Sequence, residues 1–164
     1  LLSYAQGIYD MDKQLGRLYD YIQGLEEPTI IVFYGDHLPY LKTVNGDNLL
    51  EKLKYFNTDD ALVNIYRKYN TQALILANFE IEEKEIKNLS PDLLGTYIIN
   101  KMDIDISKYY KWLYKYLYII PSANHNTVID QEGKLYYNKE LQNELKEAYK
   151  LRENIQYKYF LKNK

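Results

Sequence analysis

The residues best suited to chemistry stand together in the segment Tyr34-Gly35-Asp36-His37. An aspartate and a histidine are consecutive there, directly after a run of apolar residues. Carboxylate oxygen and imidazole nitrogen are both ligands for divalent ions such as Mn²⁺ and Zn²⁺. An ion held there could polarise a phosphoryl or sulfuryl oxygen and lower the pKa of a hydroxyl nucleophile. The pattern therefore predicts half of a metal site, with Asp36 and His37 as ligands.

The same segment also fits a plain turn. Asp36 would then cap the following backbone, and His37 would be exposed or packed without a metal. Two ligands do not make a metal site. From the spacing alone, the two interpretations have equal weight.

The residues before this segment predict a strand that presents it. Residues 29–34, Thr-Ile-Ile-Val-Phe-Tyr, are β-branched and aromatic without polar alternation. That pattern is typical of a strand covered on both faces in a parallel sheet flanked by helices. Ligands of such sheets bind at the carboxyl ends of the strands. Gly35 would allow a sharp turn there, so that both side chains face one point.

Helices are predicted around these strands. Apolar residues at steps of three and four predict a first helix that ends near Gly24: Tyr4, Ile8, Met11, Leu15, Leu18, Ile22 and Leu25. A second buried strand is predicted over residues 72–77. Further helices are predicted after four capping residues, Asp47, Thr58, Ser90 and Ser107, the third with Pro91 at its first position and an end near Lys101.

The last part of the chain has a different pattern. Residues 128–130 and 134–137, joined through Gly133, predict a β-hairpin. Asn138 is predicted to cap a long final helix. The charged residues of that helix predict a solvated face: Lys146, Glu147, Lys150, Arg152 and Glu153.

These elements together predict a layered α/β fold. Residues 1–164 are expected to form a single unit, with an α/β core over 1–120 and the hairpin and terminal helix over 121–164. The composition, 46% hydrophobic and 27% charged, is that of a globular protein.

Composition also limits the classes of function. The formal net charge of −2, without a basic stripe, argues against nucleic acid as a partner. Cysteine is absent, which excludes disulfides and thiolate chemistry. No signal peptide opens the chain, and its most apolar stretch, 112–121, is too short to cross a bilayer, so this piece is expected to be soluble. Its start inside a helical pattern predicts a piece of a longer protein.

The order of several segments resembles the lipoteichoic acid synthase branch of the sulfatases, in the alkaline phosphatase superfamily. These segments are the helix motif Tyr-x-x-x-Ile-Tyr-x-x-Asp-x-x-Leu-Gly over 4–16, the strand ending in Gly-Asp-His over 29–37, the strand over 71–78, the helix start over 89–94 and residues 107–110. Gln72 departs from the pattern, because the family often has proline there.

The resemblance implies that this chain is the C-terminal portion of a catalytic domain with a partial alkaline-phosphatase-like sheet. Asp36 and His37 would bind the catalytic divalent metal, foremost Mn²⁺, with Mg²⁺ or Zn²⁺ as alternatives. A glutamate ligand and the nucleophilic threonine would come from earlier loops. No catalytic nucleophile is therefore expected within these residues, and the piece alone should be inactive.

The resemblance also implies an activity for the parent protein. That activity is polyglycerolphosphate synthesis from a phosphatidylglycerol-like headgroup, on the extracellular face of the cell membrane. Sulfate-ester hydrolysis and phosphoethanolamine transfer are neighbours on the same fold. The remainder of the catalytic domain would be the partner of this chain, and the sequence indicates no oligomeric state.

Two alternatives stay open beside this enzyme. One is a non-catalytic glycan- or protein-binding module derived from the same fold. The other is an unrelated flavodoxin-like domain in which Asp36 binds Mg²⁺, although the chain lacks a glycine-rich phosphate loop.

Two further residues are candidates for a supporting role. Asp12, on the first helix, matches a position that the family tends to fill with aspartate, and could orient the metal loop by hydrogen bonding. His125, in the polar stretch 122–126, could approach the site. A solvated loop histidine is favoured over that role by roughly four to one, because loops collect polar residues.

Overall fold

The computed structural model describes residues 2–82, 85–102, 105 and 107–161, with side chains as far as residue 154. The chain divides into two compact units. The first holds Leu1–Asp59 and Tyr66–Glu83, and the second holds Asp60–Ile65 and Lys84–Lys164. The single unit expected over 1–164 stays a prediction.

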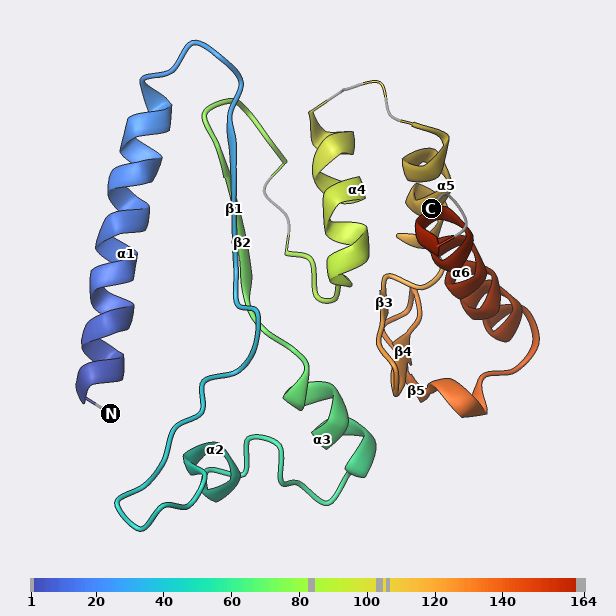
Figure 1. The fold of residues 1–164 in the computed structure, drawn as a ribbon, viewed down its shortest axis with the longest axis horizontal. Coiled ribbons are helices and arrows are strands. Elements are labelled where there is room, and N and C mark those ends of the chain that lie inside the picture. Colours follow the sequence, from blue (N-terminus) through green and yellow to red (C-terminus); the bar gives the residue numbers. More distant parts are fainter. Residues whose placement is uncertain (1, 83–84, 103–104, 106, 162–164) are drawn as a thin grey trace. The chain divides into compact units, whose positions relative to one another are not determined.

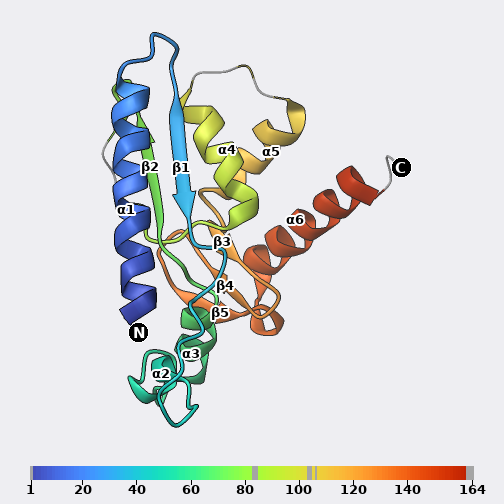
Figure 2. The same cartoon turned by 60° about the vertical axis from the view of Figure 1, so that its left-hand side comes forward.

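The first unit is built from one long helix and a pair of strands. The helix is α1 (Leu2–Gln23), and the strands are β1 (Ile30–Tyr34) and β2 (Ala73–Ala77). All three were predicted, and the structure confirms them. The helix α1 lies alongside the strand pair and contacts β2 (Figures 1 and 2).

The direction of the strand pair differs from the prediction. The strands β1 and β2 are antiparallel, with Ile30 opposite Ala77 and Tyr34 opposite Ala73. Four of the five β1 residues are half-buried and the fifth is exposed, so the strand is not fully covered on both faces. A continuous apolar run predicts that a strand forms, but it carries no information on the direction of its neighbour.

Asn78 ties the end of α1 to the strand pair. Its Nδ2 donates to the carbonyl oxygens of Ile22, Leu25 and Glu27, each at 3.0 Å. Its Oδ1 accepts from the backbone N–H of Thr29 at 2.7 Å. One amide side chain therefore binds a carbonyl in the last turn of the helix and two in the loop after it, and fixes the start of β1.

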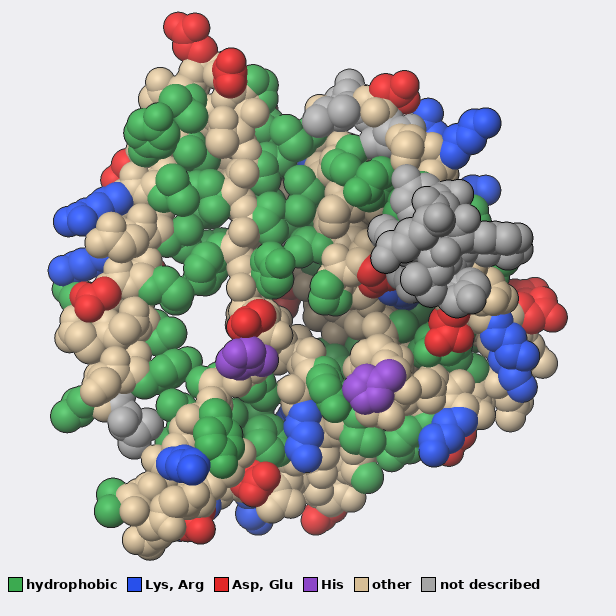
Figure 3. Space-filling view, in the orientation of Figure 1, with side chains coloured by type: hydrophobic (Ala, Val, Ile, Leu, Met, Phe, Trp, Pro, Cys, Tyr) green, Lys and Arg blue, Asp and Glu red, His purple; other side chains and the backbone are tan. Residues whose placement is uncertain are grey.

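The apolar stripe of α1 is largely open. Only Ile22 is buried, with 3% of its surface exposed. Several other members of the stripe are exposed: Tyr4, Ile8, Met11, Leu18 and Leu25. Figure 3 shows hydrophobic side chains over both this helix and the strand pair. The helix is thus held mainly at its C-terminal end.

A short helix, α2 (Leu49–Lys52), follows β1. The prediction that Asp47 caps this helix is wrong. Asn48 is the cap, and its Oδ1 accepts from the backbone N–H of Leu50 at 2.9 Å. Asp47 instead forms an ion pair with Lys52, with 2.6 Å between Oδ2 and Nζ. The hydrogen bond and the charge of Lys52 lower the pKa of Asp47.

The helix α3 (Ala61–Lys68) begins two residues later than the helix predicted directly after Thr58. Asp60, rather than Thr58, supplies the capping oxygen. Its Oδ1 accepts from the backbone N–H groups of Leu62 at 2.9 Å and Val63 at 3.1 Å. Both residue types are good caps, so composition alone does not choose between them.

Besides the first part of α3, the second unit holds the later helices of the chain and a small sheet (Figure 1). Its elements are α4 (Pro91–Lys101), α5 (Lys108–Tyr116), β3 (Ser122–Ala123), β4 (Thr127–Ile129), β5 (Leu135–Tyr137), the 3₁₀ turn η1 (Asn138–Glu140) and α6 (Asn143–Leu161). The sheet has the order β3-β4-β5 and is antiparallel. The hairpin predicted through Gly133 is confirmed, and this glycine has φ +81°. Pro91 opens α4 and Lys101 ends it, as predicted.

The buried apolar residues of this unit form two clusters. One consists of Leu93, Leu113 and Tyr116, and the other of Ile120, Val128 and Leu141. Ala148 of α6 packs against both. The terminal helix therefore joins the α4–α5 pair to the small sheet.

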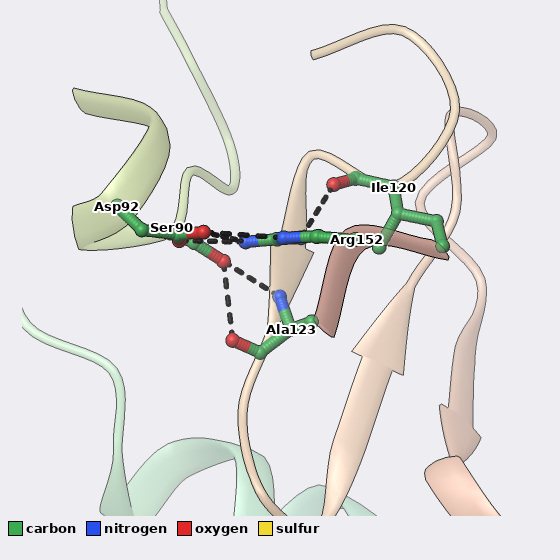
Figure 4. A network of polar contacts seen from close by, with 5 residues as sticks. All are labelled: Ser90, Asp92, Ile120, Ala123 and Arg152. Atoms are coloured by element: carbon green, nitrogen blue, oxygen red, sulfur yellow. Dashed lines mark hydrogen bonds and ion pairs between the residues drawn. The ribbon is translucent and has the colours of Figure 1, made fainter. Parts of the chain in front are cut away.

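One charged residue of α6 is buried, which corrects the prediction of a wholly solvated face. Arg152 is 4% exposed. Its Nη2 donates to both carboxylate oxygens of Asp92 at 2.6 and 2.7 Å, and its Nη1 donates to the Ile120 carbonyl at 3.0 Å (Figure 4). The guanidinium thus links the first turn of α4 to the segment before β3.

Ser90 takes part in the same network but does not cap α4 with its side chain. Its Oγ donates to the Ala123 carbonyl at 3.2 Å and accepts from the Ala123 N–H at 2.6 Å (Figure 4). The serine oxygen is therefore used to dock β3 beside α4.

Taken together, the elements confirm the predicted α/β class with a C-terminal hairpin and long helix. None of the described helices combines the length and the apolar character that crossing a bilayer requires.

Candidate metal-binding site

The loop that follows β1 presents the two predicted metal ligands next to each other. Asp36 Oδ1 and His37 Nε2 are 3.6 Å apart. Both side chains are open to solvent, with 84% of Asp36 and 77% of His37 exposed. The carboxylate and the imidazole converge rather than diverge, as a shared cation would require.

A hydrogen bond within the loop selects the tautomer of His37. Its Nδ1 lies 2.9 Å from the carbonyl oxygen of Leu38. A carbonyl oxygen only accepts, so Nδ1 carries the proton, and in the neutral ring the lone pair is on Nε2. That is the nitrogen nearest Asp36. Histidine ligands of metals usually donate their other N–H to a carbonyl or carboxylate in this way.

The spacing of the two donors fits one coordination sphere. Metal–nitrogen and metal–oxygen bonds of about 2.1 Å place two ligands at a tetrahedral angle about 3.4 Å apart. The observed separation is 3.6 Å, between side chains that are free to rotate slightly. Among the described residues, no cluster of three or more metal-ligating side chains occurs. Asp36 and His37 are therefore two candidate ligands without a third beside them in the described part of the chain.

Gly35 fixes the start of this loop, for a reason other than the predicted sharp turn. It does not have the positive φ of Gly46 and Gly133. A Cβ atom at this position would lie 3.2 Å from Cβ of Thr71, which is tighter than an ordinary contact. The glycine is needed because Thr71 approaches the backbone closely.

Both sides of Gly35 are hydrogen-bonded to the segment that leads into β2. Its N–H donates to the Gln72 carbonyl at 3.1 Å. Its carbonyl accepts from Oγ1 of Thr71 at 2.6 Å. Sequence reasoning missed Thr71, because only the pairing of β1 with β2 brings residues 35 and 71 together.

Asp12 lies exposed on α1. Within the described part of the chain, no hydrogen bond or ion pair joins it to Asp36 or His37. Its expected role in orienting the metal loop stays a prediction.

His125 belongs to the second unit, in the turn between β3 and β4. Its Nε2 lies 2.7 Å from Nδ2 of Asn126, and its carbonyl accepts from Nδ2 of Asn138 at 2.6 Å. These bonds hold it in the loop, and its approach to the metal site also stays a prediction.

Comparison with known proteins gives the family. Residues 1–90 match the family model described as Sulfatase, which is more than half of the 164 residues. The chain belongs to the Sulfatase family, within the alkaline phosphatase superfamily. The α/β elements of the first unit and the Asp36–His37 pair are thus part of a hydrolase- or transferase-like enzymatic fold.

One curated relative is similar over a longer stretch. The chain is 30% identical over 101 residues to a putative cyclic beta-1,2-glucan modification protein of Rhizobium meliloti (strain 1021). The match covers 62% of this chain and 16% of that relative, so the chain spans a small part of the relative's length. No solved structure matches.

Proposed function

We propose that this chain supplies half of the divalent-metal site of a phosphoryl- or sulfuryl-ester transferase or hydrolase. Asp36 and His37 are the ligands, and Mn²⁺ is the proposed ion, with Mg²⁺ or Zn²⁺ as alternatives. The observation that carries the proposal is the 3.6 Å separation of Asp36 Oδ1 from His37 Nε2, the nitrogen left unprotonated by the bond to Leu38.

Each residue of the loop has a distinct task in this proposal. Asp36 supplies negative charge to the cation, and His37 supplies a neutral nitrogen. The Leu38 carbonyl keeps the imidazole proton away from the metal side of the ring. When bound, the ion polarises the ester oxygen and lowers the pKa of the attacking hydroxyl. That hydroxyl, a threonine, and a further glutamate ligand are expected from the remainder of the catalytic domain.

The finer proposal for the whole protein is a lipoteichoic acid synthase-like transferase. It would take glycerophosphate from a phosphatidylglycerol-like headgroup, on the extracellular face of the cell membrane. The support is the order of segments along residues 4–110, including the strand that ends in Gly-Asp-His.

Similarity to the putative cyclic beta-1,2-glucan modification protein favours a second acceptor. That protein is described as acting in cyclic β-1,2-glucan modification, so a glycan hydroxyl could receive the transferred group here. Incubating the complete protein with a phosphatidylglycerol-like lipid, with and without a cyclic β-1,2-glucan, separates the two. A modified glucan supports the second acceptor, and a growing glycerophosphate chain supports the first.

Metal binding by His37 is the direct test of the site. We expect Mn²⁺ titrated into the complete protein to bind at least tenfold more weakly to His37→Ala than to the wild type, because one ligand is lost. His125→Ala is the matched control, since His125 is the other histidine of the chain, and it should bind as the wild type does. Equal affinity in all three proteins would refute the proposed site.

A non-catalytic glycan- or protein-binding module remains the competing proposal. It predicts that the complete protein shows no metal-dependent ester turnover, and that His37→Ala leaves its binding to glycan or protein unchanged. Turnover that requires Mn²⁺ and is lost in His37→Ala excludes the module.

A further inference from the structure

We propose that Thr71 is a positioning residue for the metal ligands, and that its hydroxyl holds the Gly35–Asp36 peptide group in the orientation that presents Asp36 and His37 together. This inference rests on the proposed metal site. It adds a residue that contributes no ligand and lies 35 positions further along the chain than Asp36.

The two peptide groups that flank Gly35 are held in different ways. The N–H of Gly35 donates to the Gln72 carbonyl at 3.1 Å, which extends the main-chain pairing of β1 with β2. The Gly35 carbonyl instead accepts from a side chain, Oγ1 of Thr71, at 2.6 Å. The bond to the Gln72 carbonyl involves only backbone atoms and does not need the side chain at position 71. The bond to the Gly35 carbonyl depends on the Thr71 hydroxyl.

The planar peptide group between Gly35 and Asp36 links this hydrogen bond to the position of Asp36. The carbonyl of Gly35 and the N and Cα atoms of Asp36 lie in one rigid plane. Fixing the carbonyl therefore fixes the direction in which Asp36 Cα leaves the strand pair. The same plane sets where the backbone to His37 begins, and the φ and ψ of Asp36 set its direction from there.

The ligands have few other constraints. The antiparallel register ends at the pair Tyr34 and Ala73. Asp36 and His37 are 84% and 77% exposed, so packing does little to hold them. Beyond that register, the bond from Thr71 Oγ1 joins the β2 segment to the start of the ligand loop.

The shape of Thr71 makes its hydroxyl a well-ordered donor. Its Cβ and Cγ2 lie 3.2 and 3.5 Å from the place where a side chain on Gly35 would begin. A β-branched side chain is stiff at χ1, and the lack of a side chain on Gly35 leaves room for the Thr71 methyl group beside the backbone. The hydroxyl is thus held on the Gly35 carbonyl without a large loss of rotamer entropy when a metal binds.

Mn²⁺ titration of the complete protein tests the inference with three variants. Thr71→Val keeps the branched shape and removes the donor, and we expect it to weaken Mn²⁺ binding about tenfold, the lower end for residues that orient metal ligands. Thr71→Ser restores a donor and should bind within about threefold of the wild type. Thr29→Val is the matched control, because Thr29 Oγ1 donates to the Glu27 carbonyl at 2.9 Å, before the opposite end of β1.

The thermal midpoint of each variant separates positioning from general stability. We expect Thr71→Val and Thr29→Val to lower the midpoint by similar amounts, while only Thr71→Val weakens Mn²⁺ binding. Wild-type affinity in Thr71→Val, or an equal loss in Thr29→Val, would overturn the inference. If Thr71→Val does not fold, Thr71→Ser is compared with Thr71→Cys, a weak donor of similar size. Thr71→Ser should then bind Mn²⁺ more tightly than Thr71→Cys, and equal affinity of the two variants would overturn the inference.

His37→Ala in the same series separates this inference from the proposed site. If Mn²⁺ binding requires His37 but not the Thr71 hydroxyl, the proposed metal site is supported and the positioning role is refuted. Binding that does not require His37 refutes both.

Discussion

At the scale of single residues, two glycines of the first unit differ in what an added methyl group would meet. A Cβ on Gly35 would lie 3.2 Å from Cβ of Thr71, an atom attached directly to the backbone. A Cβ on Gly7, inside α1, would have nothing within 4 Å. The same substitution should therefore have opposite effects at the two positions.

We expect Gly35→Ala to destabilise the complete protein by about 1–3 kcal/mol, because the neighbouring backbone has to shift. It should also weaken Mn²⁺ binding, since the shift displaces Asp36. Gly7→Ala should stabilise by about 0.5–1 kcal/mol, because alanine is the better helix former. Unfolding in urea measures both, and a Gly35→Ala protein as stable as the wild type would contradict the close approach of Thr71.

Asp130 shows how one carboxylate organises a turn. Its Oδ1 accepts from the backbone N–H groups of Glu132 and Lys134, both at 2.9 Å, and its Oδ2 accepts from the Tyr136 hydroxyl at 2.8 Å. Burial raises the pKa of Asp130, but the bonds from Lys134, Tyr136 and Glu132 outweigh it, and the net pKa is lowered.

A lowered pKa gives a definite dependence of stability on pH. The stabilisation from Asp130 is fully present above the pKa of the unfolded chain, about 3.9, and is lost as the pH falls through the lower folded value. We expect the free energy of unfolding to fall less between pH 6 and pH 3 in Asp130→Asn than in the wild type. Glu132→Gln, in the same turn, is the control and should keep the wild-type dependence. Identical pH profiles for Asp130→Asn and the wild type would contradict the assignment.

At the scale of elements, the ion pair between Arg152 and Asp92 decides how α6 is attached. The guanidinium is 4% exposed and makes three bonds to the carboxylate in addition to the one to the Ile120 carbonyl. The carboxylate is 31% exposed, so solvent screens part of the attraction. Arg152 reaches both α4 and the segment before β3, which no other charge on the described part of α6 does.

We expect Arg152→Ala to destabilise by about 2–4 kcal/mol, since it removes the charged donor from the Asp92 carboxylate and from the buried Ile120 carbonyl. Arg152→Lys should recover only part of this, because lysine lacks the planar fork. Lys150→Ala, at an exposed position of the same helix, should change stability by less than about 0.5 kcal/mol. Urea unfolding compares the three, and similar values for Arg152→Ala and Lys150→Ala would refute the structural role of Arg152.

At the scale of the whole molecule, the proposed metal half-site would connect this chain to the remainder of the catalytic domain. The Sulfatase match ends at residue 90, and the curated relative is far longer than the stretch it shares with this chain. The open apolar stripe of α1 and a sheet of two strands, marginal when alone, fit a chain that completes a larger domain.

The stabilisation of the folded protein by bound Mn²⁺ tests the proposed site at this scale. Mn²⁺ at 100 times its dissociation constant should stabilise the complete protein by about 2.7 kcal/mol. Chelation should remove that gain, and His37→Ala should not show it. A rise in the unfolding midpoint that His37→Ala shares would place the metal elsewhere.

The sequence by itself determined the features whose causes are local. The spacing of apolar residues determined α1, Pro91 determined the start of α4, and the pattern around Gly133 determined the hairpin. The consecutive Asp36 and His37 likewise marked the candidate ligands. Each of these depends on contacts between residues a few positions apart.

Only the tertiary structure decided the features that join distant segments. The bond from Thr71 to Gly35 spans 36 positions, and the pair of Arg152 with Asp92 spans 60. The antiparallel direction of β1 and β2 is of the same kind. A helix or strand pattern specifies which face is apolar, but the partner of that face depends on the packing of the whole chain. The burial of Arg152 and the hydrogen bond from Thr71 to Gly35 therefore could not be deduced from residue types.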